Sequence, residues 1–299
     1  MNNIKPSDKL HSENERILRL VSLYLNVLSD AVNKQNLESI TGGDTSANNY
    51  AYSAIMASAC GLQPYENVGD KELFRRYFVQ MVKGQAISDY INDPYYVNIK
   101  VPNAKFEAWE LCSGHYAPYE AFVYDDIEMR SDGRLLPHIG YFTEKFSYPR
   151  VTEKGREWMT VTPNEINTMR NPIEKARGDT LAFGLGLGYY AYMVSEKSTV
   201  TSVTVVERDA SVIRLFERFL LPQFPNKKKI RIVCDDAFAF ADREFKNSSF
   251  DHIFTDIWHD PSDGLELYLE MKKREALCPH ARFDYWIEKT LKCYLGESD

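Results

Sequence analysis

The sequence predicts an α/β protein in which a parallel sheet forms the C-terminal half and a helical and mixed region precedes it. Two observations lead to this prediction. After residue 162, short apolar segments alternate with amphipathic segments of helical length. A glycine-rich turn follows the first apolar segment, and acidic residues end the next three. Such an alternation is typical of parallel strands that are covered by helices on both faces.

Residues 1–92 are predicted to form a helical N-terminal region. In the first segment, apolar residues recur at spacings of three and four, namely at Ile17, Leu20, Val21, Tyr24 and Leu28. Residues 45–60 and 70–82 show the same spacing, which places their apolar side chains on one face of a helix. The segment 70–82 also begins with acidic residues, which suit the N-terminus of a helix.

Residues 93–161 are predicted to form a small β-rich region. The segments 95–101, 106–111 and 120–129 are short, rich in aromatic and β-branched residues, and separated by Pro and Gly. Residues 146–163 fit a hairpin that turns at Lys154-Gly155.

The region 162–299 contains the predicted parallel sheet. A helix begins near Thr162-Pro163, since Pro is tolerated in a first helical turn. Four strands follow, each separated from the next by a helix, at 180–184, 201–207, 229–235 and 250–257. The segments 265–277 and 283–295 then have helical spacing. The sheet is therefore expected to be truncated after its fourth strand, unless strands from 94–161 complete it.

The glycine-rich turn and the acidic residues predict a ligand site at one edge of the sheet. Gly184, Gly186 and Gly188 let the backbone approach a ligand closely, and Glu207 follows Gly188 by 19 residues. Asp235, Asp236 and Asp256 end the third and fourth strands. Carboxyl ends of parallel strands meet at one edge, where such folds bind ligands. Each residue alone also fits a structural role, as a tight turn or a helix cap, but together they describe a site for an adenosine-containing ligand.

Two stretches carry a resemblance to a known family. Residues 235–240, "DDAFAF", and residues 250–261, "FDHIFTDIWHDP", are similar to the "GDAxxF" and "YDxIxxDxxDP" stretches of class I S-adenosylmethionine-dependent methyltransferases. The spermidine-synthase-like branch of that family is the most similar, and the resemblance covers roughly residues 160–262. It implies a Rossmann-like fold and S-adenosyl-L-methionine as the cofactor.

The resemblance also implies roles for individual residues. Gly184, Gly186 and Gly188 would pass under the methionine and ribose portions of the cofactor, and Glu207 would hold the ribose hydroxyls. Asp236, beside Asp235, would bind the adenine edge together with the backbone of Ala237. Asp256 would face the methionine end and the acceptor. The segment before the first strand adds weaker pocket candidates by analogy, namely Trp158, Thr162, Asn164 and Glu165.

The chain departs from the family pattern at two places in this half. Ala182 stands where many of these enzymes carry an acidic residue that contacts the methionine amino group. Aminopropyltransferases carry a DExxYHE-like stretch before the glycine turn, whereas "TPNEINTM" here supplies only Glu165. This second departure weakens the case for polyamine synthesis.

The predicted function is methyl transfer from S-adenosyl-L-methionine to an unidentified, small-molecule acceptor. In-line methyl transfer needs alignment of the nucleophile and sometimes a base, for which Asp256 and His259 are the candidate catalytic residues. A loop histidine paired with a carboxylate fits His259 as well, and Trp258 fits either an aromatic wall or a packing role. Three alternatives stay open: an aminopropyltransferase, a non-catalytic adenosine-ligand binder, and NAD binding, because "GLGYYA" fits G-x-G-x-x-G/A.

Composition and charge favour a globular protein of the cytoplasm. The net charge of −7 gives no general signal for nucleic acid, and no apolar run is long enough for a membrane span. The five cysteines are scattered without a CxxC pair, so neither a metal site nor a disulfide framework is expected. A homo-oligomer is compatible with the sequence.

Overall fold

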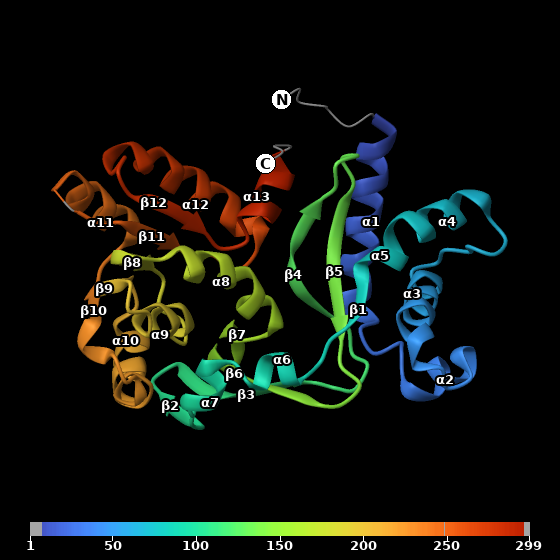
Figure 1. The fold of residues 1–299 in the computed structure, drawn as a ribbon, viewed down its shortest axis with the longest axis horizontal. Coiled ribbons are helices and arrows are strands. Elements are labelled where there is room, and N and C mark those ends of the chain that lie inside the picture. Colours follow the sequence, from blue (N-terminus) through green and yellow to red (C-terminus); the bar gives the residue numbers. More distant parts are fainter. Residues whose placement is uncertain (1–7, 248, 296–299) are drawn as a thin grey trace. The chain divides into compact units, whose positions relative to one another are not determined.

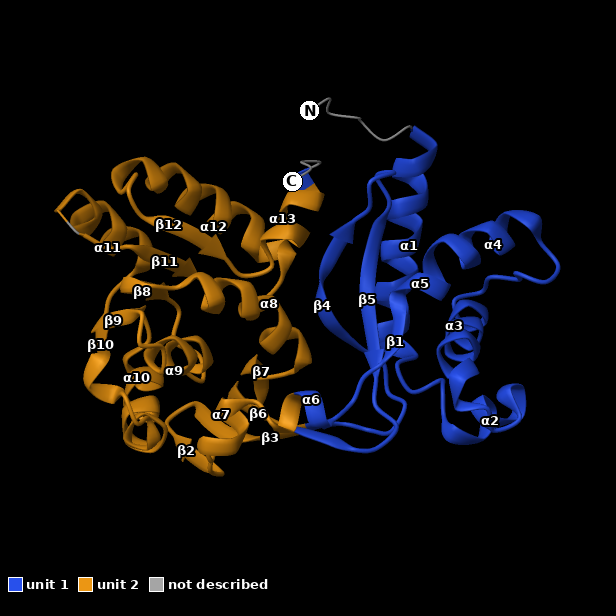
Figure 2. Ribbon diagram, viewed as in Figure 1, with its two compact units in different colours: residues 1–89, 115–147, 295–299 blue, residues 90–114, 148–294 orange. Residues whose placement is uncertain are grey.

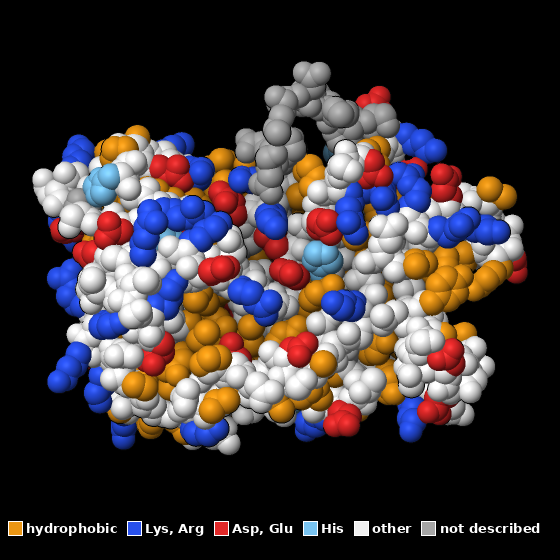
Figure 3. Space-filling model, viewed as in Figure 1, with side chains coloured by type: hydrophobic (Ala, Val, Ile, Leu, Met, Phe, Trp, Pro, Cys, Tyr) orange, Lys and Arg blue, Asp and Glu red, His pale blue; other side chains and the backbone are white. Residues whose placement is uncertain are grey.

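The computed structural model describes residues 8–247 and 249–295 (Figure 1). The chain divides into two compact units, one made of residues 1–89, 115–147 and 295–299 and the other of residues 90–114 and 148–294 (Figure 2). The unit boundaries differ from the three sequence regions, because residues 93–161 contribute to both units. We call them unit 1 and unit 2. On the face shown in Figure 3, basic and acidic side chains are interspersed.

Unit 1 packs helices against a three-stranded sheet. Its helices are α1 (Asp8–Val27), α2 (Lys34–Thr41), α3 (Asn48–Ala59), α4 (Val68–Leu73) and α5 (Val79–Met81), and the division between the units falls within α6 (Ser88–Ile91). The sheet has the order β1-β5-β4, formed by β1 (Val82–Gly84), β4 (Phe122–Met129) and β5 (Leu135–Tyr141). Helix α1 buries Ile17, Val21 and Tyr24, as its spacing predicts. Strand β1 was not predicted.

Unit 2 contains a five-stranded parallel sheet in the order β10-β9-β8-β11-β12. The strands are β8 (Gly178–Phe183), β9 (Val200–Glu207), β10 (Ile230–Cys234), β11 (His252–Thr255) and β12 (Arg282–Tyr285). Helices α9 (Tyr189–Ser195) and α10 (Ala210–Phe219) pack on one face, and α11 (Ala237–Glu244) and α12 (Pro261–Arg274) cover the other (Figure 1). The predicted Rossmann-like α/β fold is confirmed. The strand order reverses beside β8, which is where such sheets bind ligands.

The prediction that the sheet is truncated after its fourth strand is wrong. Residues 282–285 form β12, which pairs in parallel with β11, and only α13 (Glu288–Leu295) is helical in the segment predicted as one helix. Pairing with β11 and the ion pair between Arg282 and Asp284 stabilise the extended conformation there. Tertiary pairing thus overrides the helical spacing of a short segment.

The strands of residues 93–161 do not complete the parallel sheet: β4 and β5 belong to the sheet of unit 1, and the other four form a separate sheet. It has the order β2-β3-β6-β7, with β2 (Ala104–Phe106), β3 (Trp109–Tyr116), β6 (Phe146–Glu153) and β7 (Arg156–Thr160). The predicted hairpin is β6–β7, and Lys154 and Gly155 lie in its turn with positive φ.

The strand predicted at residues 95–101 is wrong, because the structure has helix α7 (Pro94–Asn98) there. Asp93 caps this helix by accepting a hydrogen bond from Tyr95 N, and Pro94 occupies the first turn. A cap followed by Pro starts a helix despite the β-branched residues downstream.

Helix α8 (Pro163–Lys175) completes the part of unit 2 that positions the site. It follows β7 directly and begins where the sequence predicts, with Pro163 in its first turn. Its buried face includes Glu165, Ile166 and Met169. The helix therefore brings an acidic side chain into the interior of unit 2.

Candidate functional site

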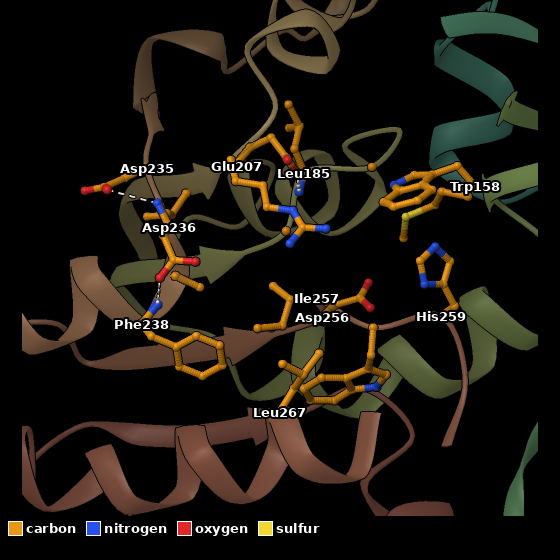
Figure 4. Close-up of a pocket in the computed structure, with 17 residues that line it drawn as sticks. Trp158, Leu185, Glu207, Asp235, Asp236, Phe238, Asp256, Ile257, His259 and Leu267 are labelled. Carbon is orange, nitrogen blue, oxygen red and sulfur yellow. Dashed lines mark hydrogen bonds between the residues drawn. The ribbon is translucent and has the colours of Figure 1, made fainter. Parts of the chain in front are cut away.

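A crevice lies at the carboxyl ends of β8, β9, β10 and β11, and it encloses about 740 Å³, including the part open to solvent (Figure 4). Eight of the nine predicted site residues line it: Gly184, Gly186, Glu207, Asp235, Asp236, Ala237, Asp256 and His259. Gly188 does not. The switch point of the sheet therefore gathers side chains that are far apart in the sequence.

The glycine turn brings the end of β8 close to the end of β11. Gly184 has a φ of 94°, and a Cβ there would lie 1.9 Å from the backbone oxygen of Asp256. Gly186 also has positive φ, and a Cβ there would meet the Met159 sulfur. Only glycine fits both requirements at Gly184, namely the left-handed backbone and the close approach of β11.

Gly188 has a structural position rather than a place in the crevice. It is the N-cap of α9, with φ of 74°, and a Cβ there would lie 2.3 Å from the Phe216 ring of α10. Its absent side chain lets α9 pack against α10.

Glu207 joins the end of β9 to the glycine turn. One carboxylate oxygen accepts a hydrogen bond from Leu185 N at 3.2 Å, and the other accepts from Asp209 N at 2.9 Å. Burial raises the pKa of this carboxyl, and the backbone N–H groups that it accepts from lower it in part. Both oxygens are held in place, and each retains a further lone pair for a ligand hydroxyl.

Asp235, Asp236 and Ala237 form the turn between β10 and α11. The Asp235 carboxylate accepts a bond from Arg243 at 2.6 Å, which lowers its pKa. Asp236 caps α11, because its Oδ1 accepts from Phe238 N at 3.0 Å and from Ala239 N at 2.9 Å (Figure 4). The bonds of the cap use one oxygen of Asp236 and leave the other facing the crevice side of the turn. Asp236 can therefore cap α11 and contact a ligand at the same time.

Asp256 follows β11 and lies at the floor of the crevice beside Ile257 (Figure 4). Burial and the nearby charge of Glu207 raise the pKa of Asp256 to about 8. A carboxyl with a pKa near neutrality can accept a proton from a reacting group and later release it.

His259 is half-exposed, and its Nδ1 lies 3.0 Å from the Asp263 carboxylate. The sequence alternative of a loop histidine paired with a carboxylate is therefore observed.

A second hollow adjoins the crevice, and we call it the tryptophan arm. Its lining includes Trp158, Glu165, Asp256, Trp258, His259 and Trp286. Trp158, Asp256, Trp258 and His259 line the crevice as well, so the two spaces meet at Asp256. Of the weaker sequence candidates, Trp158 and Glu165 line the arm, whereas Thr162 and Asn164 line neither space.

The sequence did not single out several residues that line the crevice, namely Leu185, Val206, Arg208, Phe238, Ile257 and Leu267. Most of them are immediate neighbours of predicted residues in the chain, so this adjacency could have been used to predict that they line the crevice. Leu267 lies on α12, and Trp286 of the arm follows β12. Their place depends on how the chain returns to the sheet, which local sequence does not indicate.

The described residues contain neither a metal cluster nor a membrane-spanning helix. No group of three or more His, Cys, Asp or Glu side chains within 8–247 and 249–295 has the arrangement of a metal site. None of the helices in those ranges combines the length and apolarity needed to cross a bilayer.

Among solved structures, the chain matches a crystal structure of spermidine synthase in complex with the transition-state analogue AdoDATO. The two have 18% sequence identity and a TM-score of 0.33. The match covers 47% of this chain and 52% of that chain, so it spans about half the length of the matched protein. No protein-family model and no curated protein sequence matches the chain. We therefore base the functional assignment on the residues of the crevice.

Proposed function

We propose that unit 2 is a transferase that binds an adenosyl sulfonium donor, and specifically that it moves the methyl group of S-adenosyl-L-methionine to a small-molecule acceptor. The observation that carries the proposal is the crevice itself, in which Glu207, Asp236 and Asp256 from neighbouring strand ends face one glycine turn. In this proposal Glu207 accepts the ribose hydroxyls. Asp236 and the backbone of Ala237 bind the adenine edge, and the turn from Gly184 to Gly186 lies under the sulfonium.

The charge of the crevice favours a sulfonium over a dinucleotide. Glu207, Asp235, Asp236 and Asp256 line it, and Arg208 is the basic residue with a permanent charge among its described lining residues. A sulfonium is a cation, so the carboxylates attract it. NAD carries two phosphates, which the same carboxylates repel. S-adenosyl-L-methionine is therefore the better candidate of the two.

The chemistry assigned to Asp256 is proton transfer and alignment. When the donor methyl lies at the junction of the crevice and the tryptophan arm, the arm offers the acceptor a place beside the methyl group, from which it can align with the bond that breaks. Asp256 lines both spaces, so its carboxylate can take the acceptor's proton. His259 is half-exposed and held by Asp263, which suits it to the rim rather than to the transfer itself.

Aminopropyl transfer is the second candidate, and a specific observation favours it. Arg208 is the one Lys or Arg among the described residues that line the crevice, and in the chain it adjoins Glu207 rather than Asp256. The carboxylate of the methionine moiety would therefore depend on this single cationic partner. Decarboxylated S-adenosylmethionine, the aminopropyl donor, lacks that carboxylate and needs no such partner.

The released nucleoside distinguishes the two reactions. The whole chain is incubated with each donor and a mixture of small amines, alcohols and thiols, and the products are analysed by mass spectrometry. Release of S-adenosylhomocysteine supports methyl transfer, and release of 5′-methylthioadenosine supports aminopropyl transfer. Donor binding without either product indicates a non-catalytic binder, and absence of donor binding contradicts the proposal.

A further inference from the structure

The tryptophan arm contains a buried acidic group that lacks a partner. Glu165, in the first turn of α8, is only 8% exposed, and it lines the arm. Its Oε2 has no hydrogen-bond partner among the described residues. Leaving a buried carboxyl unsatisfied costs stability, so such a group indicates a ligand that supplies the missing contact.

A second carboxyl faces the same space. Asp256 lines the arm with Glu165, and His259 is the one basic side chain among the described residues that line it. His259 is already held by Asp263. Burial and the charge of Asp256 raise the pKa of Glu165 well above its usual range, and the pKa of Asp256 is raised as well. Glu165 and Asp256 thus share a hollow whose third lining carboxylate, the exposed Glu157, is paired with Arg150, and the described lining residues supply no free cation.

The walls of the arm are indole rings. Trp158, Trp258 and Trp286 line it, which is three of the four tryptophans in the chain. The Trp286 ring is fixed because its Nε1 donates to Thr168 Oγ1 at 3.0 Å. The Trp158 ring packs edge-on against Trp109, at 5.4 Å, and against His259, at 4.3 Å. Rigid indole faces bind alkylated ammonium groups through cation–π contacts.

We propose that the tryptophan arm binds an N-alkylated ammonium group, and that the acceptor of the transfer reaction is therefore an N-alkylated amine. A bound cation favours the ionised forms of Glu165 and Asp256, so in the complex these carboxylates supply the negative charge, and the indoles contact the alkyl groups. The proposal rests on the proposed function, because the donor must occupy the adjoining crevice.

The transfer step balances in atoms and charge. The ammonium proton moves to the Asp256 carboxylate, and the freed nitrogen lone pair attacks the methyl carbon of the sulfonium. The N–C bond forms as the S–C bond breaks, and S-adenosylhomocysteine leaves. The product keeps a positive charge, which Glu165 continues to stabilise.

Choline and its neutral isostere 3,3-dimethylbutan-1-ol test the arm without turnover. Calorimetry on the whole chain should show choline binding at least about tenfold more tightly than the alcohol. Glu165→Gln keeps the shape of the side chain and removes its charge, so choline binding should weaken at least about tenfold while binding of the alcohol stays the same. Glu174→Gln, at the exposed far end of α8, is the matched control and should bind choline as the unmodified chain does.

Several outcomes overturn the inference: equal binding of choline and the alcohol, unchanged choline binding in Glu165→Gln, or tighter binding of n-butylammonium than of choline. If Glu165→Gln does not fold, the variant Trp158→Leu, at a half-buried position, replaces it in the test and should weaken choline binding. Affinity for S-adenosyl-L-methionine is measured in parallel. If the chain binds choline but not the donor, the ammonium site in the tryptophan arm is supported and the proposed function is contradicted. If it binds the donor but not choline, only the ammonium site is contradicted.

Discussion

At the scale of single residues, the site depends on carboxylates that the backbone holds in place. The Glu207 oxygens accept from Leu185 N and Asp209 N, and Asp236 accepts from two N–H groups of α11. These bonds fix the side chains before a ligand arrives, so binding loses little side-chain entropy. The sequence identified both residues because each ends a strand. The sequence also left a helix-cap role open for each acidic residue, and Asp236 takes that role with the same carboxylate.

Replacing Glu207 tests its role toward the ribose. Glu207→Ala should weaken binding of S-adenosyl-L-methionine by at least about 1 kcal/mol, because charge-assisted bonds to two hydroxyls are lost. Titration calorimetry measures the change. Glu217→Ala, an exposed glutamate on α10, is the control for loss of one negative charge. Unchanged affinity in Glu207→Ala would refute the ribose role.

Asp256→Asn should separate stability from activity. Because the pKa of Asp256 is raised to about 8, the folded state favours the protonated carboxyl. In the unmodified chain this group therefore costs stability as pH rises from the usual aspartate range through 8. At pH 8 the variant should be more stable by several kcal/mol, on the order of 5 for a shift of about four pKa units, and its turnover should be lower by about 10²-fold or more. Urea unfolding at pH 8 and a product assay measure the two effects. A variant that is less stable and fully active would contradict this account of Asp256.

At the scale of elements, the glycine turn and the strand ends define where the site lies. The sequence predicted the order from β8 to β11 because each strand is an apolar run ended by a glycine or an acidic residue. It failed at α7 and β12, which are both short. Asp93 and Pro94 start α7, and pairing with β11 extends residues 282–285. Local spacing over four or five residues does not distinguish a helix from a strand when capping or pairing decides the outcome.

Gly184→Ala tests the close approach of β8 and β11. The added Cβ would lie 1.9 Å from the Asp256 backbone oxygen, so the strand ends must separate. We expect a loss of about 3 kcal/mol or more in the free energy of unfolding, measured by urea denaturation. Gly155→Ala is the control, because Gly155 has positive φ but nothing lies within 4 Å of the position that its added methyl group would take. The free energy of unfolding of Gly155→Ala should fall only by the cost of the strained left-handed backbone, about 1–2 kcal/mol. If both variants lose the same free energy of unfolding, β11 moves away from the added methyl group without loss of stability, and the close approach of β8 and β11 is not important for stability.

At the scale of the whole molecule, two units are built from a chain that passes between them more than once. Residues 90–114 and 148–294 form the unit that contains the crevice, the arm and the parallel sheet. The sequence placed the parallel sheet in 162–299, but it could not assign residues 90–161 to either unit. That assignment depends on long-range packing, which short motifs do not encode. The tryptophan arm combines residues of β7, α8 and the segment after β12, so sequence motifs alone could not assemble it.

The acid stability of the whole chain should depend on His252. This histidine is fully buried in β11, and burial lowers its pKa from 6.5 to about 4. The folded state then favours neutral histidine, so stability is lost as pH falls from 6.5 toward 4, by about 3 kcal/mol in total. Urea unfolding at pH 7 and pH 4 measures the loss, and His252→Gln should reduce it. If both proteins lose the same stability over that range, His252 does not cause the acid sensitivity.

A crystal structure of the whole chain with S-adenosylhomocysteine tests the central claim most directly, because it locates the nucleoside. We predict ribose hydroxyls within about 3 Å of the Glu207 carboxylate, adenine against Asp236 and Ala237, and the sulfur at the turn that begins at Gly184. The nucleoside found outside this crevice, or side chains of the protein occupying the space beside Glu207, would contradict the account.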